Sequence, residues 1–371
     1  MLEVNGKYTQ ARIYAKTIED GVIEQVQSIT NHPIFKGCSV AIQADCHVGK
    51  GCVIGFTSEM PKNGEIIPNI IGVDIHCGMY VVKLKNVEEI DYERLDKVIR
   101  RNIPYGRDGR NKFSNLVPES FIEETKRICK DYIKEDWVNH VKKIGSLGDG
   151  NHFISIEQGT TGAYLIVHSG SRNIGSKLAQ HFQRIAGEKN PYIIPELSYL
   201  TGIDTENYLA CSDYCKRYAH LSRQIMAKDI LVGMRWDTDE QFETVHNYIG
   251  EDNVIRKGAI SAKEGEKVLI PLNMKDGSLI AIGKGNKEFN NSAPHGAGRV
   301  LPRKLAKETL SMEEYKKQVE GIYTTCIDIS TLDESPMAYK NGNEIVEQIS
   351  PTATVIDKLT PLYNFKAVRN K

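Results

Sequence analysis

Five short polar segments between residues 72 and 299 each carry a side chain that can bind a transition metal. The segments are GVDIHCG with Asp74 and Cys77, LGDGNHF with Asn151 and His152, LIVHSGSR with His168, VHN with His246, and PHGAGR with His295. Each ligand ends an apolar, strand-like run or lies in a glycine-rich loop, from which a fold can present side chains to a cavity. A thiolate, imidazoles and a carboxylate together suit a borderline metal such as zinc or manganese. The chain is therefore expected to fold so that these distant segments meet at one metal site.

Taken one at a time, these motifs are also compatible with plain structural roles. Cys77 can be a buried cysteine in a turn, and each histidine can be a core residue whose hydrogen bonds are satisfied. The chain has only ten histidines, however, and those in the five segments lie beside Gly, Ser, Asn or Asp rather than on amphipathic helix faces. This repetition favours the metal site. His76 lies between Asp74 and Cys77 and is expected to point away from them.

Two glycine-rich loops predict phosphate binding next to the metal site. In PHGAGR, Gly296 and Gly298 let backbone N–H groups approach a phosphate, and Arg299 can bind one through its forked guanidinium. His295 beside such a loop can act as a nucleophile that takes a phosphoryl or nucleotidyl group. The alternative is a plain glycine-rich turn. DCHVGKG, which begins with Asp45, is a second loop of this kind and can hold phosphate or orient a leaving group.

The order of the regular elements predicts an α+β fold. Short β-branched or alternating segments indicate strands at residues 39–44, 79–85, 152–156, 164–168, 268–272 and 279–282. Amphipathic patterns predict helices over residues 118–144 and 207–232. Strands and helices do not alternate as in a doubly wound sheet. Because no linker, repeat or proline-rich hinge divides the chain, residues 1–371 are expected to form a single domain.

Charge and cysteine usage limit the partners and the compartment. Lys plus Arg equals Asp plus Glu, at 48 each, so any site for a polyanion must be local. The N-terminus has no apolar signal core, and no apolar run is long enough to span a bilayer, which predicts a cytoplasmic protein that does not enter membranes. The eight cysteines show no disulfide-like spacing, which fits a reducing compartment. Cys211 and Cys215, four apart on the second predicted helix, are expected to serve packing rather than metal binding.

In order along the chain, the motifs are DxHxGxG, GVDxxCGM, GNHF, HSGSRxxG, HN, RKGA, HGAGR, PMAYK and a near-terminal lysine. In this set the chain, from Asp45 to Lys366, resembles the RtcB-type RNA ligases. The resemblance implies a single α+β domain in which mixed or antiparallel sheets pack with helices around a central metal cleft. It also implies an enzyme that uses GTP and manganese to join an RNA 3′-phosphate or 2′,3′-cyclic phosphate end to a 5′-hydroxyl end. Such enzymes act in tRNA splicing, on tRNA halves, or in RNA repair, and some need an archease-type activator.

The same resemblance implies a role for each matching residue. Cys77 would bridge two Mn²⁺ ions, with Asp74 and His152 at one ion and His168 and His246 at the other. His295 would attack the α-phosphate of GTP and form a histidine-GMP adduct, from which GMP passes to the RNA 3′-phosphate. The nucleotide would be contacted by Asn151, His295, Gly296, Gly298, Arg299 and Lys366, the last at the guanine O6. The RNA substrate would be contacted by Asp45 and Arg172.

Three positions depart from the family pattern around the nucleotide pocket. Ser155 stands where an acid usually follows GNHF, residues 271–275 read PLNMK in place of PGSMG, and Pro302 replaces a serine. A divergent paralogue with altered nucleotide preference is one hypothesis that follows.

Two other functions remain alternatives. One is a dinuclear metal-dependent phosphatase or cyclic phosphodiesterase that acts on RNA ends without a nucleotide adduct. The other is a non-catalytic protein that binds RNA ends. A basic segment can form the rim of an RNA groove or be a solvated loop; it contains Arg100, Arg101, Arg107, Arg110 and Lys112.

Overall fold

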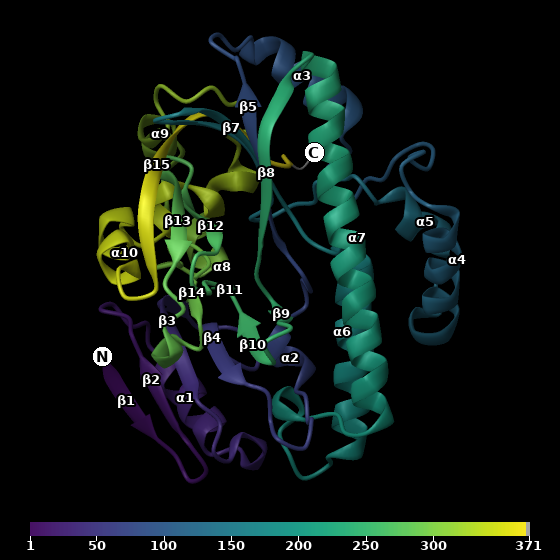
Figure 1. Cartoon of the computed structure of the whole chain (residues 1–371), viewed down its shortest axis with the longest axis vertical. Helices are drawn as coiled ribbons and strands as arrows, with labels where there is room; N and C mark the ends of the chain where they lie inside the picture. The colour runs from purple at the N-terminus through teal and green to yellow at the C-terminus, as the bar shows by residue number, and fades with distance from the viewer. Residues whose placement is uncertain (369–371) are drawn as a thin grey trace.

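A seven-stranded sheet carries most of the predicted ligand segments at the ends of its strands. The computed structural model describes residues 1–368 and places this sheet in the upper half of the molecule (Figure 1). Its strands, in spatial order, are β12 (Lys267–Asn273), β13 (Gly277–Gly283), β15 (Ala353–Phe365), β6 (Phe153–Gly159), β7 (Gly162–Ser169), β5 (Gly78–Lys85) and β8 (Asp237–Val245). All neighbouring strands run antiparallel. The sheet curls, since the Leu269 backbone N–H on one edge strand donates to the Thr244 hydroxyl on the other at 2.9 Å.

The central strands β5, β6 and β7 are buried on both faces, which explains why their sequences are mostly apolar, whereas the edge strand β8 is largely exposed and polar. Alternate residues pack into a cluster shared by five strands, namely Met79, Val81, Tyr164, Ile166, Leu269, Ile280 and Leu359. The residues between them face a second cluster, which includes Val82 and Val167 from the sheet and Leu95 and Ile230 from the helices that cover it. The sheet is thereby held rigidly, and the polar residues at its strand ends take fixed positions.

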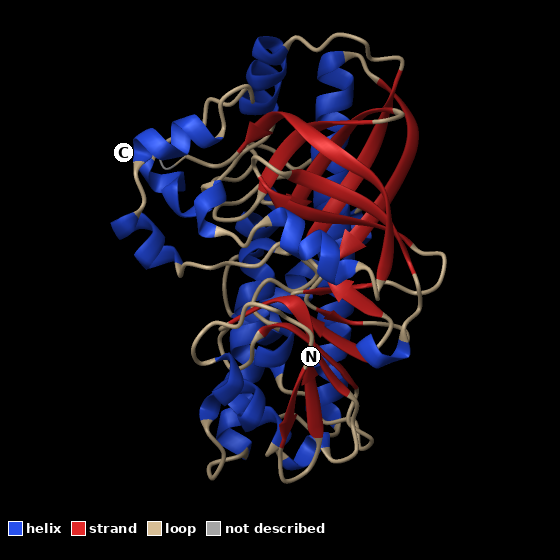
Figure 2. Cartoon of the chain, turned by 90° about the vertical axis from the view of Figure 1, so that its left-hand side faces the viewer, coloured by secondary structure: helices blue, strands red, loops and turns tan. Residues whose placement is uncertain are grey.

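A second, mixed sheet lies below the first, and Figure 2 shows the two groups of strands separately. Its spatial order is β1 (Leu2–Asn5), β2 (Gln10–Ile13), β3 (Val40–His47), β4 (Ile54–Glu59), β10 (Val254–Lys257) and β9 (Tyr248–Ile249), with only β2 and β3 parallel. A two-stranded ribbon of β11 (Ala259–Ser261) and β14 (Ser292–Pro294) leads to the predicted PHGAGR loop. The pairing of β3 with β4 is irregular between Ile42 and His47. Asp45 lies within this irregular stretch.

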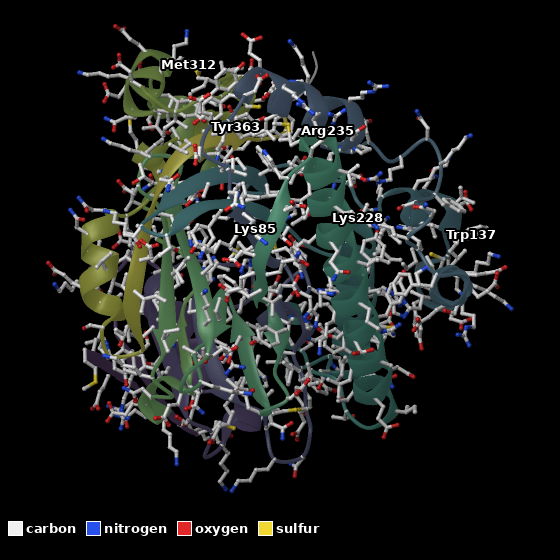
Figure 3. The ribbon with its side chains drawn as sticks, turned by 45° about the horizontal axis from the view of Figure 1, so that its top comes forward. Lys85, Trp137, Lys228, Arg235, Met312 and Tyr363 are labelled. Atoms are coloured by element: carbon white, nitrogen blue, oxygen red, sulfur yellow. The ribbon has the colours of Figure 1, made fainter. Side chains whose placement is uncertain are left out.

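Two long helices, α6 (Arg172–Lys189) and α7 (Ile203–Met234), run side by side along one flank of both sheets (Figure 1). Trp137, which begins α5, lies on the far side of α7 from the large sheet (Figure 3). The other helices are α1 (Val22–Thr30), α2 (Pro68–Ile71), α3 (Tyr92–Asn102), α4 (Glu119–Ile128), α5 (Trp137–Lys142), α8 (Arg303–Thr309), α9 (Met312–Gln318) and α10 (Gly342–Ile349). Short 3₁₀ turns occur at Pro33–Phe35, Pro195–Leu197, Lys287–Phe289, Ile329–Glu334 and Pro336–Ala338.

The predicted α+β class is confirmed, and each of the six predicted strands is present. The helix predicted over residues 207–232 is also confirmed, as the core of α7, and Cys211 and Cys215 are buried on it. The single helix predicted over residues 118–144 is wrong. Its first part ends in a π-helical turn at Cys129–Ile133, and Lys134 then adopts a left-handed conformation with φ 61°. A separate helix begins after Asp136, whose carboxylate accepts from the Val138 N–H.

Among residues 1–368, no helix combines the length and the apolar character that crossing a membrane requires.

Candidate functional site

A cavity of about 440 Å³ lies between the two sheets and gathers the predicted segments. Its wall takes side chains from both sheets, among them His47 of β3, Lys257 of β10 and Phe153 of β6. Most of the predicted site residues line it: Asp74, Cys77, Asn151, His168, His246, His295, Gly296, Gly298, Arg299 and Lys366. The predicted residues that do not line it are Asp45, His152 and Arg172.

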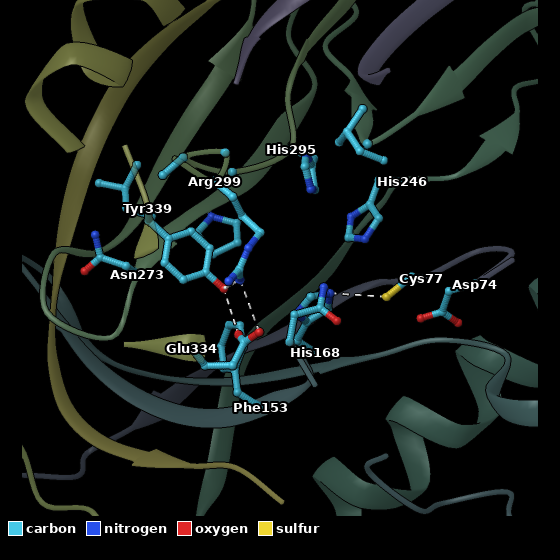
Figure 4. A pocket seen from close by; sticks show the side chains of 18 of the residues that line it. Asp74, Cys77, Phe153, His168, His246, Asn273, His295, Arg299, Glu334 and Tyr339 are labelled. Atoms are coloured by element: carbon cyan, nitrogen blue, oxygen red, sulfur yellow. Dashed lines mark hydrogen bonds and ion pairs between the residues drawn. The ribbon is translucent and has the colours of Figure 1, made fainter. Parts of the chain in front are cut away.

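The five predicted metal ligands lie close together beside the cavity, and Figure 4 shows Asp74, Cys77, His168 and His246 among them. Their donor atoms form two groups that share the sulfur of Cys77, and within each group all donor atoms lie within 4.8 Å of one another. The groups are Asp74, Cys77 and His152, and Cys77, His168 and His246. The Cys77 sulfur lies 3.4 Å from His152 Nε2 and 3.2 Å from His168 Nε2. His152 Nε2 also lies 2.9 Å from an Asp74 carboxylate oxygen.

Local backbone features make this convergence sterically allowed. A Cβ at Gly170 would lie 2.1 Å from an Asp74 carboxylate oxygen, so only glycine lets the β7–α6 turn pass so close to that side chain. His76 has a positive φ of 55° and is buried against the ring of Tyr248, with the two ring centroids 5.6 Å apart. It belongs to neither ligand group, in agreement with the expectation that it points away.

The electrostatics of the cluster match what a metal requires of its ligands. Burial lowers the pKa of His168 and of His246 well below the usual range, so both imidazoles are neutral and have a free lone pair at neutral pH. Burial would raise the pKa of Asp74, but His152 outweighs it and lowers that pKa to about 2. Burial and the Asp74 carboxylate raise the pKa of the Cys77 thiol well above its usual value. A bound metal would supply the positive charge that favours the thiolate form of Cys77.

Arg223 of α7 forms hydrogen bonds with three of the segments that carry candidate metal ligands. Its guanidinium is 1% exposed and donates to the carbonyl oxygens of His76 and Ser169, which adjoin Cys77 and His168. It also donates to Glu243 at 2.6 Å on β8, the strand that leads to His246. Arg223 could not be predicted as part of the site, because a single arginine on a long helix carries no local signal of such contacts.

His295 lies between the candidate metal ligands and the glycines of the PHGAGR loop, Gly296 and Gly298. Its Nδ1 is 2.6 Å from an Asp45 carboxylate oxygen, and the same oxygen accepts the backbone N–H groups of His295 and Gly296. Its ring centroid is 4.8 Å from that of His246. Asp45 is fully buried and was predicted to contact substrate; the structure instead places it behind His295. Asp45 lies in the stretch of β3 where the pairing with β4 is irregular.

The PHGAGR loop is shaped partly by packing. A Cβ at Gly298 would lie 2.2 Å from the carbonyl oxygen of Asp45, so glycine is required there for the loop to approach β3. The Arg299 guanidinium donates to the carbonyl oxygens of Leu301 and Asp333 and lies 3.4 Å from Glu334. These partners already accept from several N–H groups of Arg299. Phosphate binding by Arg299 stays a prediction.

A buried carboxylate that the sequence analysis did not single out organises the opposite side of the cavity. Glu334 accepts from Tyr339 at 2.7 Å and from Lys366 at 3.1 Å, and it pairs with Arg303 (Figure 4 shows its bonds to Tyr339 and Arg299). Burial would raise its pKa, but Lys366 and Arg303 hold it far below the usual range. Lys366 is itself buried, with its ammonium 5.5 Å from the centre of the Phe153 ring. Glu334 precedes the PMAYK motif, which was the available signal.

Two further predictions concern RNA contacts. Arg172 begins α6 with φ 57° and donates to the Gly106 carbonyl oxygen at 2.7 Å, while its guanidinium lies 3.5 Å from His152 Nδ1. In the proposed basic rim, Arg100 pairs with Asp96 and Arg110 with Asp229. Those two arginines are therefore held by carboxylates on the helical flank, which favours the structural alternative for them.

Comparison with known proteins gives a consistent result along most of the chain. A family model described as tRNA-splicing ligase RtcB matches residues 25–367. The chain is similar to the RNA-splicing ligase RtcB of Escherichia coli (strain K12), at 30% identity over 87% of this chain and 88% of that protein. It is also similar to the tRNA-splicing ligase RtcB of Nanoarchaeum equitans, at 26% identity over 91% and 90%. The RNA-splicing ligase RtcB2 of a second Escherichia coli strain (ATCC 25922) is 25% identical over 94% and 93%.

Proposed function

Because the chain belongs to the RtcB family of RNA ligases, we propose that it joins an RNA 3′-phosphate or 2′,3′-cyclic phosphate end to a 5′-hydroxyl end, using GTP and two Mn²⁺ ions. The observation that carries this proposal is the Asp45–His295 pair beside two ligand groups that share Cys77. A hydrolase needs the metals alone, whereas a histidine held by a buried carboxylate suits a covalent nucleotide step.

The Asp45 carboxylate gives His295 its chemical role. By accepting from Nδ1–H, it fixes the tautomer in which Nε2 carries the lone pair. Nε2 then attacks the α-phosphorus of GTP, the bond to the β-phosphate oxygen breaks, and pyrophosphate leaves. The imidazolium that forms is stabilised by Asp45. A 2′,3′-cyclic phosphate end is first opened by water, which breaks the bond to O2′ and leaves a 3′-phosphate. An oxygen of the RNA 3′-phosphate next displaces His295 from the GMP phosphorus, and the 5′-hydroxyl finally attacks the activated 3′-phosphate, releasing GMP.

The ligand set fits two divalent ions, since two imidazoles are neutral and a thiol is shared by both groups. Asp74, Cys77 and His152 would hold one ion, and Cys77, His168 and His246 the other. Bound there, manganese would neutralise phosphate charge during transfer. Asn151, Gly296, Gly298, Arg299 and Lys366 line the same cavity and would contact the nucleotide.

The partners follow from the same proposal. RNA ends of the kind that tRNA halves carry are the substrate, in tRNA splicing or RNA repair, and an archease-type protein is a candidate activator. We place the reaction in the cytoplasm, where Cys77 stays reduced; all eight cysteines are buried and free.

The proposal is tested by a joining assay. An RNA with a labelled 3′-phosphate and a 5′-hydroxyl is incubated with the protein, Mn²⁺ and GTP, and the label is followed into a phosphatase-resistant junction. Joining that requires both Mn²⁺ and GTP is the expected result. Release of the label as inorganic phosphate, without joining and without a need for GTP, would instead establish the metal-dependent phosphatase.

Asp45→Asn should slow adduct formation while leaving nucleotide affinity close to that of the wild type. The amide can donate to Nδ1 and favour the wrong tautomer, and the same replacement behind the catalytic histidine of a serine protease lowers turnover by about 10⁴-fold. Single-turnover labelling with α-labelled GTP measures the rate, and its dependence on GTP concentration gives the affinity. An unchanged rate constant would show that Asp45 does not position His295.

A further inference from the structure

Three buried polar side chains from neighbouring strands line one part of the cavity wall. Glu157 of β6, Ser278 of β13 and Asn364 of β15 are 3%, 1% and 4% exposed, and all three face the cavity. β15 pairs with both β6 and β13, which brings the three strands together, and Asn364 lies opposite Ser155. We call these three residues the acceptor recess.

Oxygens of the acceptor recess lack hydrogen-bond partners within residues 1–368. These atoms are Glu157 Oε2 and Asn364 Oδ1, and beside Glu157 lies the Ser278 hydroxyl, which can donate as well as accept. The other Glu157 oxygen accepts from the Ser155 hydroxyl at 2.8 Å, which orients the carboxylate. Buried acceptors without partners are rare in folded proteins, because they lose their hydration without compensation. Two such atoms together in the wall of a cavity, Glu157 Oε2 and Asn364 Oδ1, indicate a ligand that brings hydrogen-bond donors.

The charge state of Glu157 is consistent with such a ligand. Burial raises its pKa to about 7, and the nearby Ser155 and Ser278 groups oppose this rise only in part. A ligand that donates to the carboxylate favours its ionised form. The carboxylate is thus available as an acceptor near neutral pH, and binding a donor would remove the cost of burying its charge.

The neighbouring side chains complete a site for a planar base. Phe153 lies on the same face of β6 and offers an aromatic ring, and the Lys366 ammonium lies 5.5 Å from the centre of that ring. One donor of Lys366 goes to Glu334, so others remain for a ligand carbonyl. Guanine carries two adjacent N–H donors, N1–H and the 2-amino group, beside a carbonyl oxygen. Adenine and cytosine present a ring-nitrogen acceptor at the corresponding place, which two acceptors would repel.

We infer that Glu157 and Asn364 read the N1–H and 2-amino donors of the guanine base in the nucleotide donor. The inference rests on the proposed function, because it names the specificity residues of the same site. In this chain the acidic residue is then Glu157, two residues beyond Ser155 and on the same face of β6. The departure from the family pattern at Ser155 is thereby offset within this chain.

The test is equilibrium binding of GMP, IMP and AMP to the metal-free protein by calorimetry. IMP lacks only the 2-amino group. The wild-type chain should bind GMP more tightly than IMP, and IMP more tightly than AMP. In Glu157→Gln, GMP affinity should fall by about 10- to 100-fold, as for the loss of a hydrogen bond to a charged group. Gln158→Glu, an exposed change on the opposite face of β6, should keep wild-type affinities.

Three results would overturn the inference: wild-type affinity for AMP equal to that for GMP, no binding of any of the three, or Glu157→Gln affinity for GMP within twofold of wild type. The comparison of nucleotides on the wild-type chain does not depend on a variant folding. Because binding of GMP needs neither metal nor adduct, its outcome is separate from the joining assay. If the protein prefers GMP but does not join RNA, the proposed ligase function is refuted and the inferred guanine recognition stands. If it joins RNA but does not prefer GMP, the inferred recognition by the acceptor recess is refuted and the ligase function stands.

Discussion

His295→Ala is expected to abolish covalent labelling by α-labelled GTP while leaving Mn²⁺ binding close to wild type. The variant removes the only atom that we propose attacks the α-phosphorus, whereas the two ligand groups do not include His295. Its buried partner Asp45 belongs to neither ligand group. The label is measured after denaturing electrophoresis, and its loss in acid identifies a phosphorus–nitrogen bond.

Two histidine variants make this result specific. His181→Ala changes a residue of α6 that does not line the cavity and whose ring packs against those of Tyr132 and Phe182, and it should label like the wild type. His47 also lines the cavity, and burial lowers its pKa to about 4, so its imidazole is neutral as well. If His295→Ala still becomes labelled and His47→Ala does not, His47 is the nucleophile. Label that survives in both would refute a histidine adduct at either position.

Much of the fold was predictable where local sequence and tertiary structure agree. The strands β5 and β7 and the helix α7 have patterns that match their surroundings along their whole length. The helix over 118–144 failed because its amphipathic pattern continues through Lys134, at which the backbone becomes left-handed. The edge strand β8 was missed since its sequence, DTDEQFETV, is largely polar. β15 was missed as well; it contains Pro361, which it accommodates beside a register shift.

The candidate metal ligands of the site could be predicted from the sequence, but the buried residues that position the site could not. Thiols and imidazoles that recur next to Gly, Ser, Asn or Asp at strand ends are typical of metal ligands, so Cys77, His168 and His246 could be proposed as ligands from chemistry alone. Glu334, Arg223 and the buried position of Asp45 could not. Their roles come from contacts with residues distant in sequence, such as the bond between Glu334 and Lys366. Buried charges of this kind resemble ordinary surface residues until the fold places them.

Cys77→Ala should have the broader effect of the two cavity variants, removing both metals and all adduct formation. Its sulfur is the one donor that belongs to both ligand groups, and it lies within 3.4 Å of a histidine nitrogen from each. His246→Ala should weaken one ion only, since the group of Asp74, Cys77 and His152 stays complete. Metal content after dialysis and Mn²⁺ titration followed by electron paramagnetic resonance measure the number of ions held.

The control for Cys77→Ala is Cys211→Ala, which removes a buried thiol from α7 and should leave metal content unchanged. Parallel titration with Zn²⁺ shows which metal the thiolate and imidazoles prefer, because both metals suit such donors. If Cys77→Ala kept two ions and full labelling, the assignment of Cys77 as a ligand of both ions would be wrong. The histidines and Asp74 alone would then hold the metals. If it kept one ion and lost the adduct, Cys77 would be a ligand to a single ion. The number of ions lost with this one sulfur therefore decides whether the two ligand groups form one dinuclear centre.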